Sequence, residues 1–193
     1  NPRASNLFFA MFPAFIIIQA RLNSTRFPRK VLQNLGGAPM LAQQVERARK
    51  VLGITDVVVA TSNSSTDDEL FRVCQNLGIT TFRGSESDVL GRFREAAKFA
   101  IEKSKTGSNK KIRIVRLTGD CPLIDPDLIE RSLNALTESV DYVGYDSSFQ
   151  DGMDVESFWL DSLLKADKEA KKDSEREHVT PYLWNNPKIF RLS

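Results

Sequence analysis

The feature that most constrains the fold is an apolar run near the N-terminus that changes abruptly into a cationic segment. The run Ile16–Ile18 has the pattern of a strand buried on both faces, as in the centre of a parallel sheet. The next residues interleave cations with small side chains, namely Ala20, Arg21, Ser24, Thr25, Arg26, Arg29 and Lys30. Loops at the carboxyl ends of such strands usually bind ligands, and small residues let backbone N–H groups and cations approach an anion. We therefore predict a polyphosphate site here. The alternative is a set of solvated surface cations.

The rest of the chain alternates segments of strand and helix character. Strands are expected at 56–61, 79–83, 112–117 and 140–145, and helices at 39–52, 67–77, 90–103 and 125–136. Beyond Gln150 the pattern is less regular, with a strand at 155–159, helices at 162–171 and 174–184, and a final strand at 189–192. The alternation predicts an α/β fold, a three-layer α/β/α sandwich with a mostly parallel sheet.

Length and composition limit the classes of protein to consider. The chain has 193 residues, 41% of them hydrophobic and 27% charged, which suits one globular domain. A net charge of +2 is too small to favour a nucleic-acid partner. Cys74 and Cys121 form no disulfide framework or metal motif, so a reducing cytoplasm is expected. The apolar stretch 7–18 contains Pro13 and is too short to span a membrane, and it does not resemble a signal peptide.

The opening segment also carries a family resemblance. Gln19-Ala20-Arg21-Leu22-Asn23-Ser24-Thr25-Arg26-Phe27-Pro28-Arg29-Lys30, followed by Leu35-Gly36-Gly37-Ala38-Pro39-Met40, resembles the start of nucleotidyltransferases that make CMP-activated sugar acids. It is most similar to the spore coat polysaccharide biosynthesis protein F family, and CMP-KDO and CMP-sialic acid synthetases share its Ala-Arg, Ser-x-Arg and Pro-x-Lys landmarks. The resemblance implies the Rossmann-like fold of nucleotide-diphospho-sugar transferases. It places residues 1–10 outside the domain, as an extension or cloning remnant, and the nucleotidyltransferase domain at 11–193, without its natural C-terminal end.

Two positions depart from the family pattern. Asn23 and Arg29 stand where glycine is common. Asn tolerates a left-handed backbone better than most residues. Arg29 has a long side chain that either crowds the phosphates or points outward.

The resemblance implies a reaction and the residues that perform it. Transfer of CMP from CTP to a sugar acid, with release of pyrophosphate, is expected in polysaccharide or glycan biosynthesis. Arg21, Lys30 and Asp120 would be catalytic, and Asp120 would hold Mg²⁺. The nucleotide would contact Gln19, Ala20, Arg21, Asn23, Ser24, Arg26, Lys30, Ser62, Ser85, Asp88 and Arg92. The family's second metal-binding carboxylate comes from a later segment. Either the chain continues beyond Ser193, or Asp154 or Glu156 substitutes, or metal binding is impaired.

The residues themselves support part of this assignment and leave alternatives. Asp120 follows a strand and a glycine, so its carboxylate should lie at the same edge as the opening segment, although an aspartate there also braces a turn. Ser85 and Asp88 could hydrogen-bond a pyrimidine edge. Alternatively, Asp88 and Arg92, four residues apart, form a helical surface ion pair.

Two blocks near the C-terminus are predicted to bind the acceptor. Alternation places Asp154 and Glu156 on one side of an extended segment, and Arg176 suits a substrate carboxylate. Glu177 and His178 lie beside Arg176, and for His178 substrate binding or packing is preferred to proton transfer. An alternative is that Ser174 and Glu177 form a helix capping box. Further acids are expected on a solvated helix face, namely Asp161, Asp167, Glu169 and Asp173.

Two other functions remain open at this point. A glycosyltransferase that uses a nucleotide sugar could share the architecture, because fold does not determine function. A non-catalytic sugar-nucleotide-binding protein is the second alternative. The family resemblance also leaves a homodimer open, and no membrane partner is expected.

Overall fold

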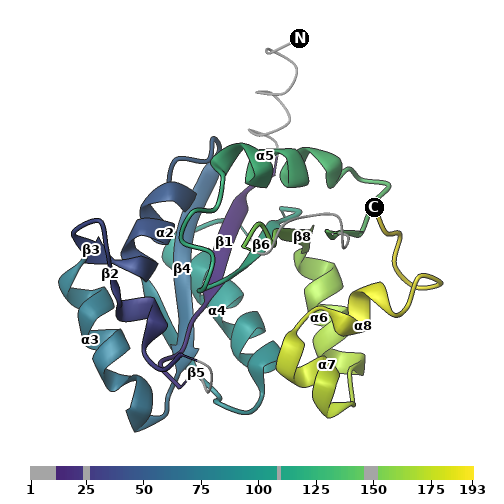
Figure 1. The fold of residues 1–193 in the computed structure, drawn as a ribbon. Helices are drawn as coiled ribbons and strands as arrows, with labels where there is room; N and C mark the ends of the chain where they lie inside the picture. The colour runs from purple at the N-terminus through teal and green to yellow at the C-terminus, as the bar shows by residue number, and fades with distance from the viewer. Residues whose placement is uncertain (1–11, 24–26, 108–109, 146–151) are drawn as a thin grey trace.

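A six-stranded mixed sheet forms the centre of the computed structural model, which describes residues 12–23, 27–107, 110–145 and 152–193 (Figure 1). The strand order is β5-β4-β1-β6-β8-β7. The strands are β1 (Ala14–Gln19), β4 (Ile54–Ser62), β5 (Thr81–Gly84), β6 (Arg113–Thr118), β7 (Tyr142–Val143) and β8 (Glu156–Trp159). The first four strands along the order are parallel, whereas β8 is antiparallel to both β6 and β7. Among the described strands of this sheet, β8 therefore runs opposite to the other five.

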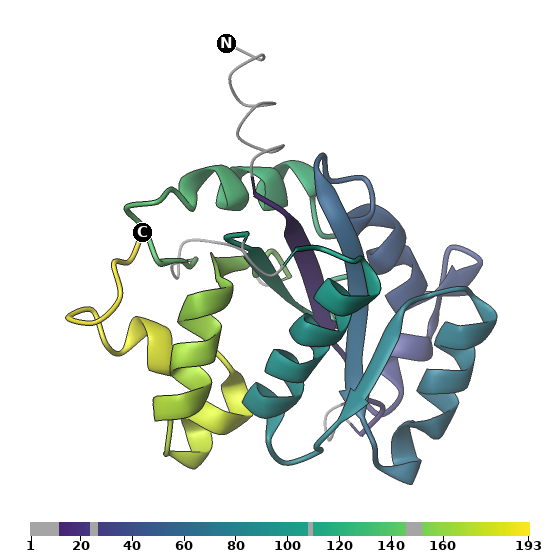
Figure 2. The same ribbon diagram turned by 180° about the vertical axis from the view of Figure 1, so that it is seen from behind.

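Helices cover both faces of this sheet, as Figures 1 and 2 show from opposite sides. They are α2 (Met40–Ala48), α3 (Asp68–Asn76), α4 (Val89–Lys103), α5 (Pro126–Ala135), α6 (Leu160–Glu169), α7 (Asp173–His178) and α8 (Pro181–Trp184). Buried side chains of α2, α3 and α5 pack on one face, and those of α4, α6 and α8 pack on the other. Short elements complete the chain: the 3-10 turns η1 (Lys30–Leu32) and η2 (Ser65–Asp67), and the hairpin β2 (Asn34–Leu35) and β3 (Ala38–Pro39). The predicted three-layer fold is confirmed.

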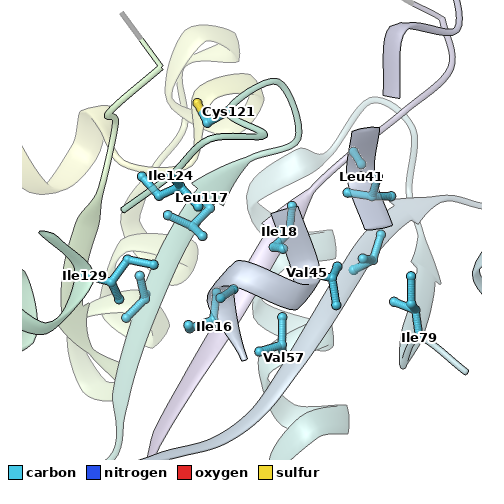
Figure 3. Close-up of a cluster of buried hydrophobic side chains, with 14 of the residues drawn as sticks. Ile16, Ile18, Leu41, Val45, Val57, Ile79, Leu117, Cys121, Ile124 and Ile129 are labelled. Carbon is cyan, nitrogen blue, oxygen red and sulfur yellow. The ribbon is translucent and has the colours of Figure 1, made fainter. Parts of the chain in front are cut away.

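The apolar run in β1 forms the middle of both hydrophobic cores. Ile16 and Ile18 pack with Leu41 and Val45 of α2 on one face (Figure 3). Ile17 points the other way and joins the cluster that includes α4. All three isoleucines have no exposed surface, and burial of each contributes roughly 1.5–3 kcal/mol. From Ala14 to Ile18 the strand is apolar at every position because both of its faces are covered.

Several predicted elements near the C-terminus differ from the structure. The helix expected at 174–184 is divided into α7 and α8, because buried Val179 has a positive φ of 73° and reverses the chain direction. The strand expected at 140–145 is paired only at Tyr142–Val143, and the one at 189–192 is reduced to a single parallel bridge between Tyr142 and Leu192. No helix of the described residues is long and apolar enough to cross a bilayer.

The end of β6 lies unusually close to the end of β1. The backbone N–H of Gly119 donates to the carbonyl of Gln19 at 2.8 Å. A Cβ on Gly119 would lie 2.9 Å from the Cβ of Ala20, closer than real Cβ contacts allow, and 3.0 Å from the Gln19 carbonyl oxygen, which is tighter than most. Glycine is therefore required at position 119, and this contact places Asp120 beside the segment that follows β1.

We expect Gly119→Ala to reduce the free energy of unfolding by about 1–3 kcal/mol, since the added methyl group must push two central strands apart. Gly107→Ala is the matched control, because a Cβ there meets nothing within 4 Å. Urea denaturation measures both variants. Equal stabilities of the two variants would contradict the close approach of β1 and β6.

Candidate active site

The cationic segment and the acid at position 120 meet at the carboxyl edge of the sheet. Lys30, the first residue of η1, donates from Nζ to Asp120 Oδ2 at 2.7 Å. The two side chains are 25% and 44% exposed, so the ion pair remains accessible to a ligand. The structure thus brings together two of the three residues predicted to be catalytic, although they are ninety positions apart.

Asp120 has the properties of a hard-cation ligand. Partial burial acts to raise its pKa, but hydrogen bonds from Lys30 and Thr118 outweigh that effect, and the net pKa is lowered. The carboxylate is therefore ionised at neutral pH. No cluster of three or more acids, histidines or cysteines occurs among the described residues. The donor set fits Mg²⁺, which takes one or two carboxylates and completes its shell with water and phosphate oxygens.

The segment that follows β1 is called the opening loop (residues 20–29). Its described residues do not all lie beside the Lys30–Asp120 pair. Arg21 is exposed and lines a separate cavity of about 390 Å³, with Glu86, Ser87 and Arg176 among its neighbours. Ala20 is buried, and its N–H donates to the Ala60 carbonyl at 3.2 Å. Gln19 lies at the end of β1 and Asn23 is exposed. The predicted contacts Ser24 and Arg26 lie outside the described residues.

The two departures from the family pattern have different structural roles. Arg29 occupies the left-handed region with φ 61°, whereas Asn23 is not among the described non-glycine residues with positive φ. The left-handed backbone conformation that glycine favours therefore occurs at position 29 and not at position 23. The Arg29 guanidinium forms a bidentate ion pair with Glu69 of α3, at 2.6 and 2.5 Å. Of the two expectations for this side chain, the outward orientation holds.

Asp67 is a buried residue that sequence reasoning did not place in the site. Its carboxylate accepts from the Leu22 N–H at 2.7 Å, from the Ser62 N–H at 3.2 Å and from the Ser62 hydroxyl. It thereby ties the opening loop to the end of β4. Ser62, which is predicted to contact the nucleotide, is 1% exposed, and its hydroxyl donates to Asp67 in this structure. Asp67 is the first residue of the helix expected at 67–77, where an acid is an ordinary first-turn residue, so no signal marked it.

The loop between β5 and α4 contains the predicted group Ser85, Asp88 and Arg92. Asp88 caps α4 by accepting from the Gly91 N–H at 3.0 Å, and its own N–H donates to the Ser85 hydroxyl at 3.0 Å. The alternative of an exposed Asp88–Arg92 pair is wrong: Arg92 is 2% exposed, and its Nη1 donates to the Ser85 carbonyl at 2.5 Å. Asp88 forms its ion pair with Arg176 instead.

Arg92 retains unused hydrogen-bonding capacity. Its Nε and Nη2 atoms are buried and find no acceptor in the described part of the chain. Burial lowers its pKa, which Asp67 partly offsets, and Arg21 lies near enough to lower it further. Buried donors of a charged group without partners are costly. A water molecule or an anionic ligand beside the opening loop would satisfy them.

A larger cavity of about 860 Å³ lies on the β8 side of the site. Its lining includes Arg116, Tyr142, Glu156 and His178. The Glu156 carboxylate is buried and accepts from both Arg116 and Tyr142, and Arg116 Nη2 also approaches Gln19 Oε1 at 3.4 Å. The predicted pair Glu156 and His178 therefore shares one cavity. Arg116 and Tyr142 belong to the cavity too, but they sit inside strand patterns and could not be distinguished from ordinary strand residues.

Asp154, the other predicted acid of this block, is partly buried. Burial raises the pKa of Cys121 and of Tyr145, and the charge of Asp154 raises both further. Asp154 therefore lies near Cys121, which follows Asp120, and near Tyr145, which lines the cavity.

Arg176 does not line the large cavity. Its guanidinium, which is predicted to bind a substrate carboxylate, donates in this structure to the carboxylates of Asp88 and Asp167. Asp167 is also not on a solvated face, because its side chain is 9% exposed and pairs with Arg94 and Arg176. The capping box of α7 is formed by Glu175, which accepts from the Lys171 and Lys172 N–H groups, and not by Ser174 and Glu177. Glu177 is exposed and lies near Arg21.

Comparison with known proteins identifies the family. Residues 15–193 match the sequence profile of the cytidylyltransferases. The chain belongs to the cytidylyltransferase family. It is 37% identical over 182 residues to the spore coat polysaccharide biosynthesis protein SpsF of Bacillus subtilis, an alignment that covers 91% of this chain and 72% of SpsF. This membership makes the protein a nucleotidyltransferase.

Two further relatives extend the comparison. A 3-deoxy-manno-octulosonate cytidylyltransferase of Anaeromyxobacter dehalogenans is 36% identical over 126 residues, which covers 65% of this chain and 48% of that enzyme. The solved structure of a cytidylyltransferase from Leptospira borgpetersenii superposes with a TM-score of 0.82 at 33% identity, covering 94% of this chain and 74% of that one. The cytidylyltransferase family and the three-layer fold are thus supported both by sequence and by structure.

We expect Asp67→Ala to lower the free energy of unfolding by about 2–3 kcal/mol, because the buried N–H groups of Leu22 and Ser62 lose a charged acceptor. Asp127→Ala, an exposed acid in the first turn of α5, should cost less than about 1 kcal/mol. Chemical denaturation compares the two. A loss at Asp67 no larger than the loss at Asp127 would contradict the role of Asp67 in holding the opening loop.

The Asp120 carboxyl should titrate below its ordinary pKa of 3.8, and Lys30→Met should raise that pKa. Because the folded-state pKa is lowered, ionised Asp120 stabilises the fold above the ordinary value, and this contribution is lost as pH falls through the folded pKa. Carboxyl ¹³C NMR of the magnesium-free protein measures the titration. An identical Asp120 pKa in the two proteins would show that the ion pair does not form in solution.

Proposed function

We propose that this cytidylyltransferase transfers CMP from CTP to a hydroxyl group of a sugar acid and releases pyrophosphate. The observation that carries the proposal is the convergence of Lys30 and Asp120 at 2.7 Å on the carboxyl edge of the sheet. A lysine and an ionised carboxylate at one edge suit a triphosphate with its cation. The sugar-acid acceptor is supported by the relative named as a 3-deoxy-manno-octulosonate cytidylyltransferase.

On the nucleotide side, the chain supplies charge and orientation. Lys30 would hold the triphosphate together with Arg21, and would stabilise the charge that accumulates on the leaving pyrophosphate. Asp120 would hold Mg²⁺, which neutralises phosphate charge and polarises the α-phosphoryl group when bound. The unused donors of Arg92 would face the loop that carries the nucleotide. Asn23, Ser24, Arg26 and Ser85 remain further candidates for nucleotide contacts.

In the proposed reaction, an acceptor hydroxyl oxygen attacks the α-phosphorus and forms the new P–O bond. The bond between the α-phosphorus and the bridging oxygen breaks, pyrophosphate leaves with the electron pair, and the hydroxyl proton passes to solvent. No covalent protein intermediate is needed, so alignment and charge neutralisation supply the rate enhancement. CTP as donor also agrees with a cytoplasmic reaction.

On the acceptor side, the large cavity offers groups suited to a sugar. Glu156, Arg116 and Tyr142 form a polar surface for hydroxyl groups, and His178 lies on the α7 side. Tyr145 and Trp184 also line the cavity and are 45% and 46% exposed, so their rings are available for packing against a sugar ring. Asp154, near Cys121 and Tyr145, would contact either the acceptor or the metal ion.

The proposal predicts that CTP with Mg²⁺ stabilises the protein by about 2.7 kcal/mol at a hundredfold excess over Kd, and that pyrophosphate is released when a suitable sugar acid is added. Lys30→Ala should reduce kcat/KM by about 10²–10³-fold, because it removes a charge that acts in the transition state. Lys50→Ala, an exposed lysine after α2, is the control and should retain activity. Thermal shift and a coupled pyrophosphate assay over a panel of sugar acids measure these effects.

Each alternative function gives a distinct result in this experiment. Stabilisation by a UDP- or GDP-sugar but not by CTP would overturn the proposal in favour of a glycosyltransferase. Tight CTP binding with no pyrophosphate release from any acceptor would favour a non-catalytic sugar-nucleotide-binding protein.

A further inference from the structure

Arg176 is the centre of a compact ion-pair cluster that joins three elements around the site. The cluster consists of Asp88, Arg94, Asp167 and Arg176 and is called the Arg176 cluster below. Arg176 donates from Nε and Nη2 to the two carboxylate oxygens of Asp88 at 2.8 and 2.7 Å. It donates from Nη2 to Asp167 Oδ1 at 2.8 Å and from Nη1 to the Asp167 carbonyl at 2.7 Å. The side chain is 23% exposed, so the cluster is only partly screened by water.

The Asp88 end of the cluster is rigid. Asp88 caps α4 through the Gly91 N–H, and a Cβ at position 91 would lie only 2.2 Å from Asp88 Oδ2. Glycine at 91 is what lets this carboxylate lie over the first turn of α4 and reach Arg176 at the same time. Asp88 therefore connects the loop on the nucleotide side to α7.

The Asp167 end fixes the opposite side of Arg176. Asp167 is 9% exposed and also accepts from Arg94 Nη1 at 2.5 Å. Two arginines and one buried carboxylate thus hold α6 against α4, with α7 attached through Arg176. A bidentate guanidinium has one suitable geometry for such a set, and lysine cannot reproduce it.

The chain that follows Arg176 forms a wall of the large cavity. His178 comes two residues later, and Val179 then turns the backbone with its positive φ, so that Thr180, Pro181 and Trp184 also line the cavity. Val179 is fully buried, which prevents this turn from relaxing freely. The position of this wall is therefore determined by where Arg176 is held.

We propose that Arg176 is a positioning residue that sets the acceptor-side wall of the cavity through Asp88 and Asp167, and that it does not contact the acceptor itself. The kinetic part of this inference rests on the proposed function. The positional part does not, because it concerns the location of His178 in the free protein. If the proposal is correct, Arg176→Lys and Asp167→Asn both weaken acceptor binding, although Asp167 does not line the cavity.

The first measurement follows the imidazole of His178 by ¹H–¹³C NMR in the free protein. This probe is clean because His178 is the only histidine in the chain. Arg176→Lys and Asp167→Asn should both shift its ring resonances. Arg49→Lys, which alters an ion pair with Glu46 at the far end of α2, should leave them unchanged. Unchanged His178 resonances in both folded cluster variants would overturn the proposal, whether or not the protein shows any turnover.

The second measurement determines the KM of the acceptor and the Kd of CTP separately, with a sugar acid that the enzyme converts. Both cluster variants should raise the acceptor KM by about 10-fold or more, since small misplacements of binding groups are costly. The Kd of CTP should stay within about twofold of the wild-type value. If Arg176 bound the acceptor carboxylate directly, Asp167→Asn would free the guanidinium, and the acceptor KM would stay the same or fall. That result, or a loss confined to CTP binding, would contradict the positioning role.

Discussion

The contact between the ends of β1 and β6 is the constraint on which the site depends. Gly119 can approach Gln19 and Ala20 so closely only because it has no side chain and because residue 20 is small. This approach sets the distance between the opening loop and Asp120. Had either position carried a larger residue, Lys30 and Asp120 would stand apart, and one triphosphate with its bound cation could not contact both side chains. The chemistry of the site therefore rests on a steric requirement in the backbone of two neighbouring parallel strands.

Carboxylates of the protein hold the opening loop and several of the described arginines around the site. Asp67 holds the opening loop by its backbone, Glu69 binds Arg29, and Asp88 with Asp167 binds Arg176. Lys30 differs because its partner, Asp120, is itself an expected metal ligand, so a nucleotide with its cation can replace the contact on both sides at once. In the proposed function, the fixed pairs give the site its shape, and the Lys30–Asp120 pair is the one that opens to bind the nucleotide. This division explains why the number of cations in the sequence overestimates the number free to bind an anion.

The fold was predictable because β1, β4 and β6 each contain a run of apolar and β-branched residues, and α5 has both a capping aspartate and a proline at its first position. The meeting of Lys30 and Asp120 was also predictable, since both follow parallel strands. The roles of Asp67, Asp167 and Arg176 were not, because a charged residue on a helical pattern looks the same whether its partner is water or a distant side chain. The interruption of the expected helix at Val179 could not be predicted for a related reason. A buried valine with positive φ is held by tertiary packing, and local propensity argues against it.

The reversal of strand direction at β8 has a consequence for how such a protein can diversify. Groups expected to contact the nucleotide up to Asp120 stand at the ends of parallel strands, whereas Asp154 and Glu156 stand where an antiparallel strand begins. Apart from Arg116 of β6, the acceptor-side groups from β7 through α8 therefore belong to one continuous stretch of polypeptide. A single exchange of genetic material downstream of α5 could replace the acceptor preference as a module and leave the inherited nucleotide chemistry intact.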